Sequence, residues 1–448
     1  MGYPNPSILA WNRSFDDQSL LAGGSHLAKV SEALKYLNSL DPEQDDELVL
    51  MMDAYDIHMQ LPKSVLIDRY YETRNAAQKR IEDFAGRRAT AGEGIQQLVM
   101  FGAGKRCAPN LPHSVACYPI PESPLPADLY GANTDTVIGR NVWTSFRQRY
   151  LNSGYVLGPA GAMRRMFAEA WKQIEEYPTE DPLDDGSGYA LRWYHGSDQS
   201  IFANMYGRQE WAREKLRIRH APAGTKPHTS EIYGSLVDNA LDPSFTHEQF
   251  DPDLGEGNPY EFGMYLDFWS DFGHQTINSE WDAQWITYDG RTPAEAQLSG
   301  SRMAFDCPAR VPGALPEDIL RSRLPVEALR RRSRDEDEDE EEASSPWLGR
   351  RLYTHVCISR IPVFRHMNGP KEHREWDWPM IWYQGQARQM LGELKELLKD
   401  VPAKETWEEF KADPALDVAG GIWTDEGTAM GWDELCPAEY EQELFRDV

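Results

Sequence analysis

Two aspartates that follow an apolar run are the residues of this sequence best suited to metal chemistry. They stand in the segment Asp53-Ala54-Tyr55-Asp56, one residue after the apolar run 48–51. A short apolar run of this kind predicts a buried strand, so both carboxylates are expected where a strand ends and a loop begins. Two carboxylates three positions apart can hold a hard divalent cation against a phosphate. The alternative is that they only close the strand as turn residues.

Three further stretches place polar side chains next to predicted strands or helix starts: 150–154 with Asn152, 196–200 with Asp198, and 364–371 with His366 and Lys371. Mn²⁺ accepts a mixed shell of carboxylate and imidazole, so Asp53, Asp56 and His366 suit it better than they suit Ca²⁺. A lysine adds a point charge for a phosphate. Each residue also has a purely structural alternative. The histidine could bond to backbone at a strand end, Asp198 could cap a helix, and the lysine could be plain surface.

The elements that must position these residues alternate between strand and helix over the first 220 residues, which predicts an α/β sheet. The predicted strands are 7–11, 48–53, 97–101 and 150–157, and the predicted helices are 25–40, 62–84, 163–174 and 198–208. Residues 107–135 are rich in proline and glycine and predict a loop. Further on, residues 352–363 predict a strand and 380–398 a helix.

Residues 221–329 differ in composition from the preceding part of the chain and predict an aromatic-rich β insertion. Aromatic residues are dense between Tyr260 and Tyr288, with turn residues between them, which favours short β segments, including a hairpin, packed on the main sheet. Residues 330–345 hold four arginines and then eight acids, a composition that predicts a disordered loop. The remaining segment, 346–448, is expected to complete the core and to add a helical tail.

Composition limits the kinds of partner. The 448 residues carry a net charge of −27, which argues against nucleic acid or an anionic membrane as the main partner. No run of 18 apolar residues predicts a membrane span, and no signal peptide opens the chain. The five cysteines lack CxxC spacing. Cys107 and Cys117 are close enough in sequence to pair in an oxidising compartment, and the odd count leaves at least one thiol outside any intramolecular pair.

Taken in order, the four stretches resemble the glycosyltransferase domain of the procollagen lysyl hydroxylases and related fungal and viral glycosyltransferases. That family's pattern runs acidic-x-Tyr-Asp, then Leu-Asn-Ser-Gly, then Asp-Gln before an aromatic-rich helix, then His-x-Asn-Gly-Pro, and all four occur here. Residues 23–30 also resemble its glycine-rich segment followed by a lysine. The resemblance covers roughly residues 2–220 and 350–390.

The resemblance implies a GT-A fold, in which a nucleotide-binding mixed sheet flanked by helices occupies residues 1–220 and uses Mn²⁺ to hold a UDP-sugar. Carried over by position, the implied roles are metal ligation for Asp53, Asp56 and His366; nucleotide and phosphate contacts for Tyr55, Lys29, Gly369 and Lys371; an acceptor-side position for Asp198; and the sugar pocket for Asn152. The expected activity is transfer of a hexose to a protein or glycan acceptor in the Golgi or endoplasmic reticulum lumen, or outside the cell.

Three departures from the family pattern qualify that expectation. The strand and helix that precede the counterpart of residues 7–11 have no counterpart here, which predicts weak nucleotide binding through truncation. The family's tryptophan after its counterpart of Phe101 is absent, and its acidic cluster before Asp-Gln is reduced to Gly196-Ser197-Asp198. A non-catalytic glycosyltransferase-like protein that binds a glycan or partner is therefore the main alternative. A metal-dependent sugar-phosphate hydrolase is another, although it would need a second acidic or histidine cluster.

Overall fold

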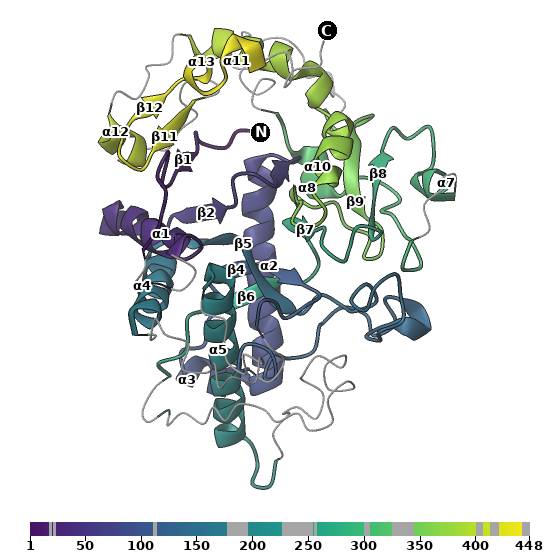
Figure 1. Ribbon diagram of the computed structural model, residues 1–448. Helices are drawn as coiled ribbons and strands as arrows, with labels where there is room; N and C mark the ends of the chain where they lie inside the picture. The colour runs from purple at the N-terminus through teal and green to yellow at the C-terminus, as the bar shows by residue number, and fades with distance from the viewer. Residues whose placement is uncertain are drawn as a thin grey trace, which may run out of the picture.

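The structure is a computed structural model that describes residues 1–17, 20, 24–110, 114–176, 196–225, 254, 258–299, 305–324, 345–399, 406–412 and 421–440. These residues form a mixed α/β protein in which several small sheets are flanked by helices (Figure 1). The principal helices are α1 (Ala28–Ser39), α2 (Lys63–Ala85), α3 (Arg87–Gly92), α4 (Ala160–Glu176), α5 (Asp198–His220) and α11 (Ala387–Leu398). Shorter helices are α7 (Ala294–Ser299), α8 (Glu317–Arg321), α10 (Glu372–Asp377), α12 (Trp407–Ala412) and α13 (Trp432–Leu435).

The central sheet has the order β2-β5-β4-β6. Its strands are β2 (Leu48–Met52), β5 (Tyr150–Pro159), β4 (Val99–Gly104) and β6 (Met264–Asp267). β5 runs antiparallel to both of its neighbours, β2 and β4, whereas β6 is parallel to β4. Both faces of this sheet are covered, which explains why its strands read as apolar runs and not as alternating patterns.

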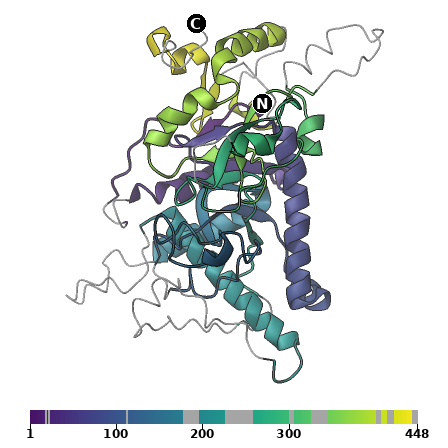
Figure 2. The same ribbon diagram turned by 90° about the vertical axis from the view of Figure 1, so that its right-hand side faces the viewer.

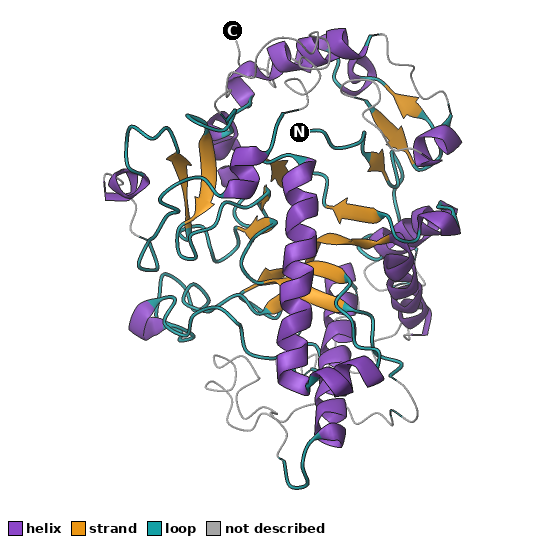
Figure 3. Ribbon diagram, turned by 180° about the vertical axis from the view of Figure 1, so that it is seen from behind, coloured by secondary structure: helices purple, strands orange, loops and turns teal. Residues whose placement is uncertain are grey.

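Alternate residues of β4 pack into two different hydrophobic cores, one on each face of the sheet. Val99, Phe101 and Ala103 pack with residues of α1, α4 and α5, whereas Met100 packs with Tyr155 and the first turns of α2. This follows from the two-residue period of a strand. Seen from behind, α2 crosses the sheet as a long central helix (Figure 3). The sheet is thus held between α2 and the group α1, α4 and α5.

Three smaller sheets complete the fold. One has the order β3-β10-β7, with β3 (Ile57–Met59), β10 (Phe364–His366) and β7 (Gly273–Gln275). A second pairs β8 (Ala283–Thr287) with β9 (Arg351–His355), antiparallel. The third joins β1 (Ser7–Ile8) to β11 (Ile422–Thr424) and β12 (Ala429–Met430) at the top of the molecule (Figures 1 and 2).

The structure corrects several expectations about elements. The strand at 7–11 is only Ser7–Ile8, and it pairs with β11 and not with the central sheet. Its continuation is prevented at Ala10 and Asn12, which have φ of 58° and 52°, outside the extended region. The short strands between 260 and 288 form no hairpin, because β6, β7 and β8 pair in three different sheets.

Two C-terminal expectations also need correction. The strand predicted over 352–363 ends at His355 and is followed by a turn closed by a bridge between His355 and Arg360. The helix predicted over 380–398 becomes two short 3₁₀ turns, η4 (Trp378–Met380) and η5 (Gln384–Gln386), followed by α11. The acidic run at 335–342 lies outside the described residues.

Two disulfides join segments of the described chain. Cys107 is bonded to Cys117, as their spacing suggested, and Cys307 is bonded to Cys357. Within the described residues, none of the helices is long and apolar enough to cross a membrane.

Candidate metal and phosphate site

The two aspartates of the sequence motif lie on the turn between β2 and β3. The backbone N–H of Asp53 donates to the carbonyl of Gly154 at 2.9 Å, which extends the β2–β5 pairing by one residue. The carbonyl of Asp56 accepts from the N–H of Met367 at 2.7 Å, just beyond β10. Both aspartates are therefore fixed by backbone hydrogen bonds to other strands, and the expected strand-end position is confirmed.

His366 reaches this turn from the last position of β10. It is paired in register with Ile57, the residue after Asp56, and its side chain is 2% exposed. Its ring lies against Gly154 of β5, where a side chain would collide with it. The glycine therefore creates the space that allows the imidazole to approach the aspartates.

Asp53, Asp56 and His366 converge as expected. The Nε2 atom of His366 lies 3.4 Å from Oδ1 of Asp56 and 3.9 Å from Oδ2 of Asp53, and one ligand atom of each residue lies within 4.8 Å of the others. The buried Oδ1 of Asp56 faces only this imidazole nitrogen among the described ion-pair partners of Asp56. Two carboxylate oxygens and one imidazole nitrogen form a donor set that fits a divalent transition ion such as Mn²⁺.

In each aspartate, the carboxylate oxygen that does not face His366 binds a basic side chain. Oδ1 of Asp53 accepts from Nζ of Lys29 at 2.7 Å, and Oδ2 of Asp56 lies 3.3 Å from Arg374 of α10. Burial alone would raise the pKa of Asp56, but hydrogen bonding and charge from His366, with Arg374 and Lys371 behind it, hold that pKa below its usual value. Asp56 is therefore ionised at neutral pH.

Lys29 connects the aspartate turn to Asp198. Its Nζ lies 2.7 Å from Asp53, 3.1 Å from Oδ2 of Asp198, and donates to the carbonyl of Ser153 at 2.8 Å. Burial alone would lower the pKa of Lys29, but Asp198 and Asp53 outweigh it and raise the pKa above its usual value. The positive charge of Lys29 at neutral pH holds two carboxylates from different elements together.

Asp198 is the first residue of α5, and its neighbour Gln199 ties the helix start to β5. Ser197 caps the helix by accepting from the N–H of Ser200. The amide of Asn152 donates to Gln199 at 2.9 Å, and its carbonyl oxygen accepts from the N–H of Gly154 at 2.9 Å. Asn152 thus positions both Asp198, through the helix start, and Gly154, which lies under His366.

The remaining sequence candidates lie at the rim. Tyr55 is 89% exposed at the tip of the aspartate turn. Gly369 donates its N–H to Oγ1 of Thr276 at 3.1 Å, and Asn368 donates to Gln275 of β7 at 2.7 Å. These bonds fix the segment that carries Lys371, the residue preceding α10, whose charge acts on Asp56.

Two site residues were not indicated by any sequence motif. Arg374 pairs with Asp56, and Gln275 accepts a hydrogen bond from Asn368. Arg374 lies 318 positions from Asp56 in the sequence, and no spacing rule connects them. The only signal was that Arg374 follows Lys371 by three residues, one helical turn, which places two basic side chains on a common face.

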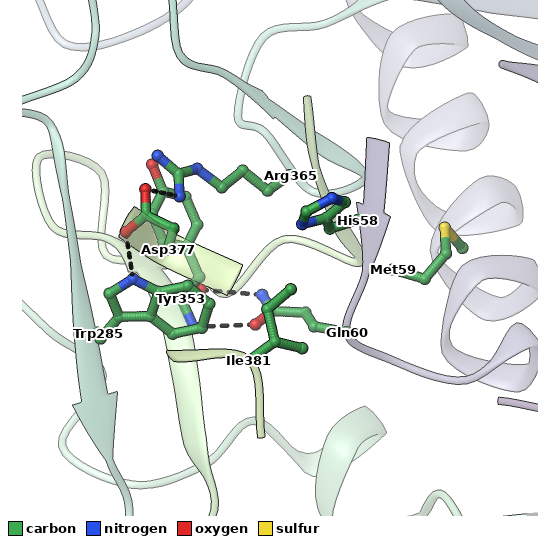
Figure 4. A pocket seen from close by; sticks show the side chains of 8 residues that line it. All are labelled: His58, Met59, Gln60, Trp285, Tyr353, Arg365, Asp377 and Ile381. Atoms are coloured by element: carbon green, nitrogen blue, oxygen red, sulfur yellow. Dashed lines mark hydrogen bonds and ion pairs between the residues drawn. The ribbon is translucent and has the colours of Figure 1, made fainter. Parts of the chain in front are cut away.

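A pocket lies on the opposite face of the β3-β10-β7 sheet. It is lined by His58, Met59, Gln60, Trp285, Tyr353, Arg365, Asp377 and Ile381 (Figure 4). Arg365 and Asp377 form an ion pair there, and Trp285 donates to Asp377 at 3.2 Å. Arg365 is the neighbour of His366 in β10, so strand alternation separates this pocket from the aspartate turn.

No protein-family model matches the chain, and the search of curated proteins found no match either. The resemblance to glycosyltransferases therefore rests on the motif residues and on their geometry.

Proposed function

We propose that this protein is a Mn²⁺-dependent glycosyltransferase of the GT-A type that transfers a hexose from a UDP-sugar to a protein or glycan acceptor. The observation that supports it most is the convergence of Asp53, Asp56 and His366 from widely separated segments. A shared metal site is the simplest reason for two carboxylates and a buried imidazole to meet at a strand end. The central mixed sheet flanked by helices is compatible with such a fold.

In this proposal, Asp53, Asp56 and His366 would hold the metal. A cation at this place stabilises the negative charge that develops on a departing diphosphate. Lys29 and Arg374 orient the two carboxylates by holding the oxygens that do not face His366. Lys371 adds a positive charge that acts on Asp56 and could bind a phosphate oxygen.

Asp198 would lie on the acceptor side of the site. Its Oδ2 lies 3.1 Å from Nζ of Lys29. Its ion pair with Lys29 keeps it close to the aspartate turn without making it a metal ligand. Tyr55, exposed at the turn, is free to pack against a nucleotide base.

A lumenal or extracellular location belongs to the same proposal. Two disulfides in the described chain favour an oxidising compartment, because thiols are kept reduced in the cytosol. The net charge of −27 remains compatible with a protein or glycan acceptor and disfavours nucleic acid.

The decisive experiment screens UDP-sugars for hydrolysis and transfer with and without Mn²⁺, using the full chain. We expect turnover that requires Mn²⁺ and is lost on chelation. Calorimetry with UDP and Mn²⁺ separates the alternatives: binding without turnover of any sugar would favour the non-catalytic, glycosyltransferase-like protein. Absence of both UDP binding and turnover would reject the proposal.

A further inference from the structure

A second group of possible ligands lies in the interior, away from the aspartate turn. His274 is in β7, Asp282 directly precedes β8, and His355 is the last residue of β9. One ligand atom of each lies within 4.8 Å of those of the other two. All three side chains are buried, with exposed fractions of 0% for His274 and Asp282 and 1% for His355.

Strand register separates this cluster from the first one. His274 pairs with Arg365 of β10, whereas the next residue, Gln275, pairs with His366. Because successive residues of a strand point to opposite faces, His274 and His366 lie on opposite faces of the β3-β10-β7 sheet. The cluster is therefore a distinct site.

Backbone pairing fixes the cluster in place. His355 is paired in register with Ala283, the residue after Asp282. The N–H of Val356 donates to the carbonyl of Asp282 at 2.8 Å, and the N–H of His355 donates to the carbonyl of Arg360 at 2.7 Å. Cys357, two residues beyond His355, is in the disulfide with Cys307. Ligands held on strand ends by such bonds are preorganised for a metal.

Each of the three side chains has one buried polar atom without a hydrogen-bond partner among the described residues. These atoms are Nε2 of His274, Oδ1 of Asp282 and Nδ1 of His355. An unsatisfied buried polar group typically costs about 1–3 kcal/mol, so three in one cluster require an explanation. A bound ion that accepts a lone pair from each of the three atoms would explain why they have no hydrogen-bond partner.

The other polar atoms of His274 and Asp282 are already engaged. Nδ1 of His274 lies 2.9 Å from the hydroxyl of Tyr353. Oδ2 of Asp282 lies 2.7 Å from Nζ of Lys105 and accepts from the hydroxyl of Tyr130 at 2.9 Å. Outer groups that hold the second atom of a ligand are typical of metal sites. The same arrangement occurs at Asp53, where Lys29 holds one oxygen and the other faces His366.

We propose that His274, Asp282 and His355 bind a structural Zn²⁺ ion that links β7, β8 and β9. Two imidazoles and one carboxylate are ordinary zinc ligands, and a water molecule can complete a tetrahedral shell. Complete burial favours a structural role, because no ligand is open to substrate. Lys105 neutralises the charge of Asp282, so the affinity should be lower than at a site with an unpaired carboxylate.

The test measures metal content in a chain whose first site has been removed. The full chain carrying Asp53→Asn and Asp56→Asn is produced in medium containing Zn²⁺ and analysed by plasma mass spectrometry. We expect about one equivalent of Zn²⁺ per chain. Adding His355→Gln, which keeps a polar side chain but removes the imidazole, should lower the content roughly tenfold or more. The matched control His58→Gln, on the same face of the sheet, should retain the metal.

A second measurement keeps the test valid if the glutamine variant does not fold. In the chain with intact His274, Asp282 and His355, removal of Zn²⁺ by a chelator should lower Tm by several degrees, on the order of 5 °C, and Zn²⁺ should restore it. Co²⁺ substitution should give visible absorption bands typical of tetrahedral coordination. Absence of metal both as purified and after incubation with Co²⁺ would overturn the proposal and assign the cluster to buried water. Retention of Zn²⁺ by the folded His355→Gln chain would overturn it as well.

Discussion

Gly154 and His366 are matched by shape: a Cβ built on Gly154 would lie 2.0 Å from Cε1 of His366 and 2.7 Å from each ring nitrogen. The imidazole therefore rests on the bare backbone of β5. Since the carbonyl of Gly154 also accepts from Asp53, this glycine positions two of the three residues of the aspartate site. The glycine that ends the Leu-Asn-Ser-Gly motif therefore matters because it has no side chain, which leaves room for the ring of His366.

Gly154→Ala should displace His366 and weaken Mn²⁺ binding and turnover by about tenfold or more, because metal ligands tolerate little displacement. The strain should also cost about 1–3 kcal/mol of unfolding free energy. Calorimetric Mn²⁺ titration and chemical denaturation measure the two effects. The control is Gly104→Ala in β4, where the added Cβ would be 3.8 Å from its nearest neighbour. Normal Mn²⁺ affinity in Gly154→Ala would contradict the role of His366.

If the proposed activity holds, Asp56→Asn should lower UDP-sugar turnover by about 100-fold or more, since it removes a charged ligand of the proposed metal ion and leaves Arg374 without its partner. The fold should persist, because the residue lies on a turn. Circular dichroism and melting curves check the fold, and Asp83→Asn, on the exposed side of α2, serves as the matched control. Unchanged Mn²⁺-dependent turnover would reject the metal role, whereas loss of folding would show that Asp56 is mainly structural.

Lys29→Met should have opposite effects on stability and on metal affinity. Without the ammonium, Asp53 and Asp198 repel each other, and we expect a loss of about 1–2 kcal/mol, moderated because the pair is partly exposed. The same loss of positive charge should strengthen Mn²⁺ binding to Asp53. Melting temperatures with and without Mn²⁺ should therefore differ more in this variant than in the parent chain. Lys79→Met, at an exposed ion pair of α2, should leave that difference unchanged.

The two disulfides should contribute unequally to stability. Cys307–Cys357 closes a separation of 50 residues and Cys107–Cys117 one of 10. The chain-entropy relation gives about 4 kcal/mol for the longer loop and about 3 kcal/mol for the shorter. Replacing Cys307 and Cys357 by serine should thus lower the denaturation midpoint more than replacing Cys107 and Cys117. The reverse order would show that native packing, and not loop closure, dominates.

Local features of the fold were predictable because local forces decide them. The apolar run before Asp53, the helical stripe of α1 and the proline that precedes α2 predicted these elements close to their observed bounds. The start of α5 at Asp198 was also expected, since an acid in the first turn interacts favourably with the helix dipole. The helix continues beyond the predicted end to His220, because the later turns are mostly charged and bury only a narrow apolar stripe, Ala212 and Leu216, which is a weak helical signal.

Pairing between distant segments was not predictable. Short strands such as β1, β3 and β7 carry too few residues to specify a partner, so their partners are set by the packing of the whole chain. For this reason the local pattern places the strand at Ser7 in the wrong sheet and predicts a hairpin where β6, β7 and β8 join three different sheets.

The sequence by itself determined which residues could bind a metal at the aspartate turn, because Asp53, Asp56 and His366 stand in recognisable motifs at strand ends. Only the tertiary structure decided that they meet, that Lys29 and Arg374 hold their outer oxygens, and that Gly154 makes room for the imidazole. It alone revealed His274, Asp282 and His355, which share no motif. The physical reason is that ligand identity is a property of side-chain chemistry, whereas ligand geometry depends on strand register and on long-range packing.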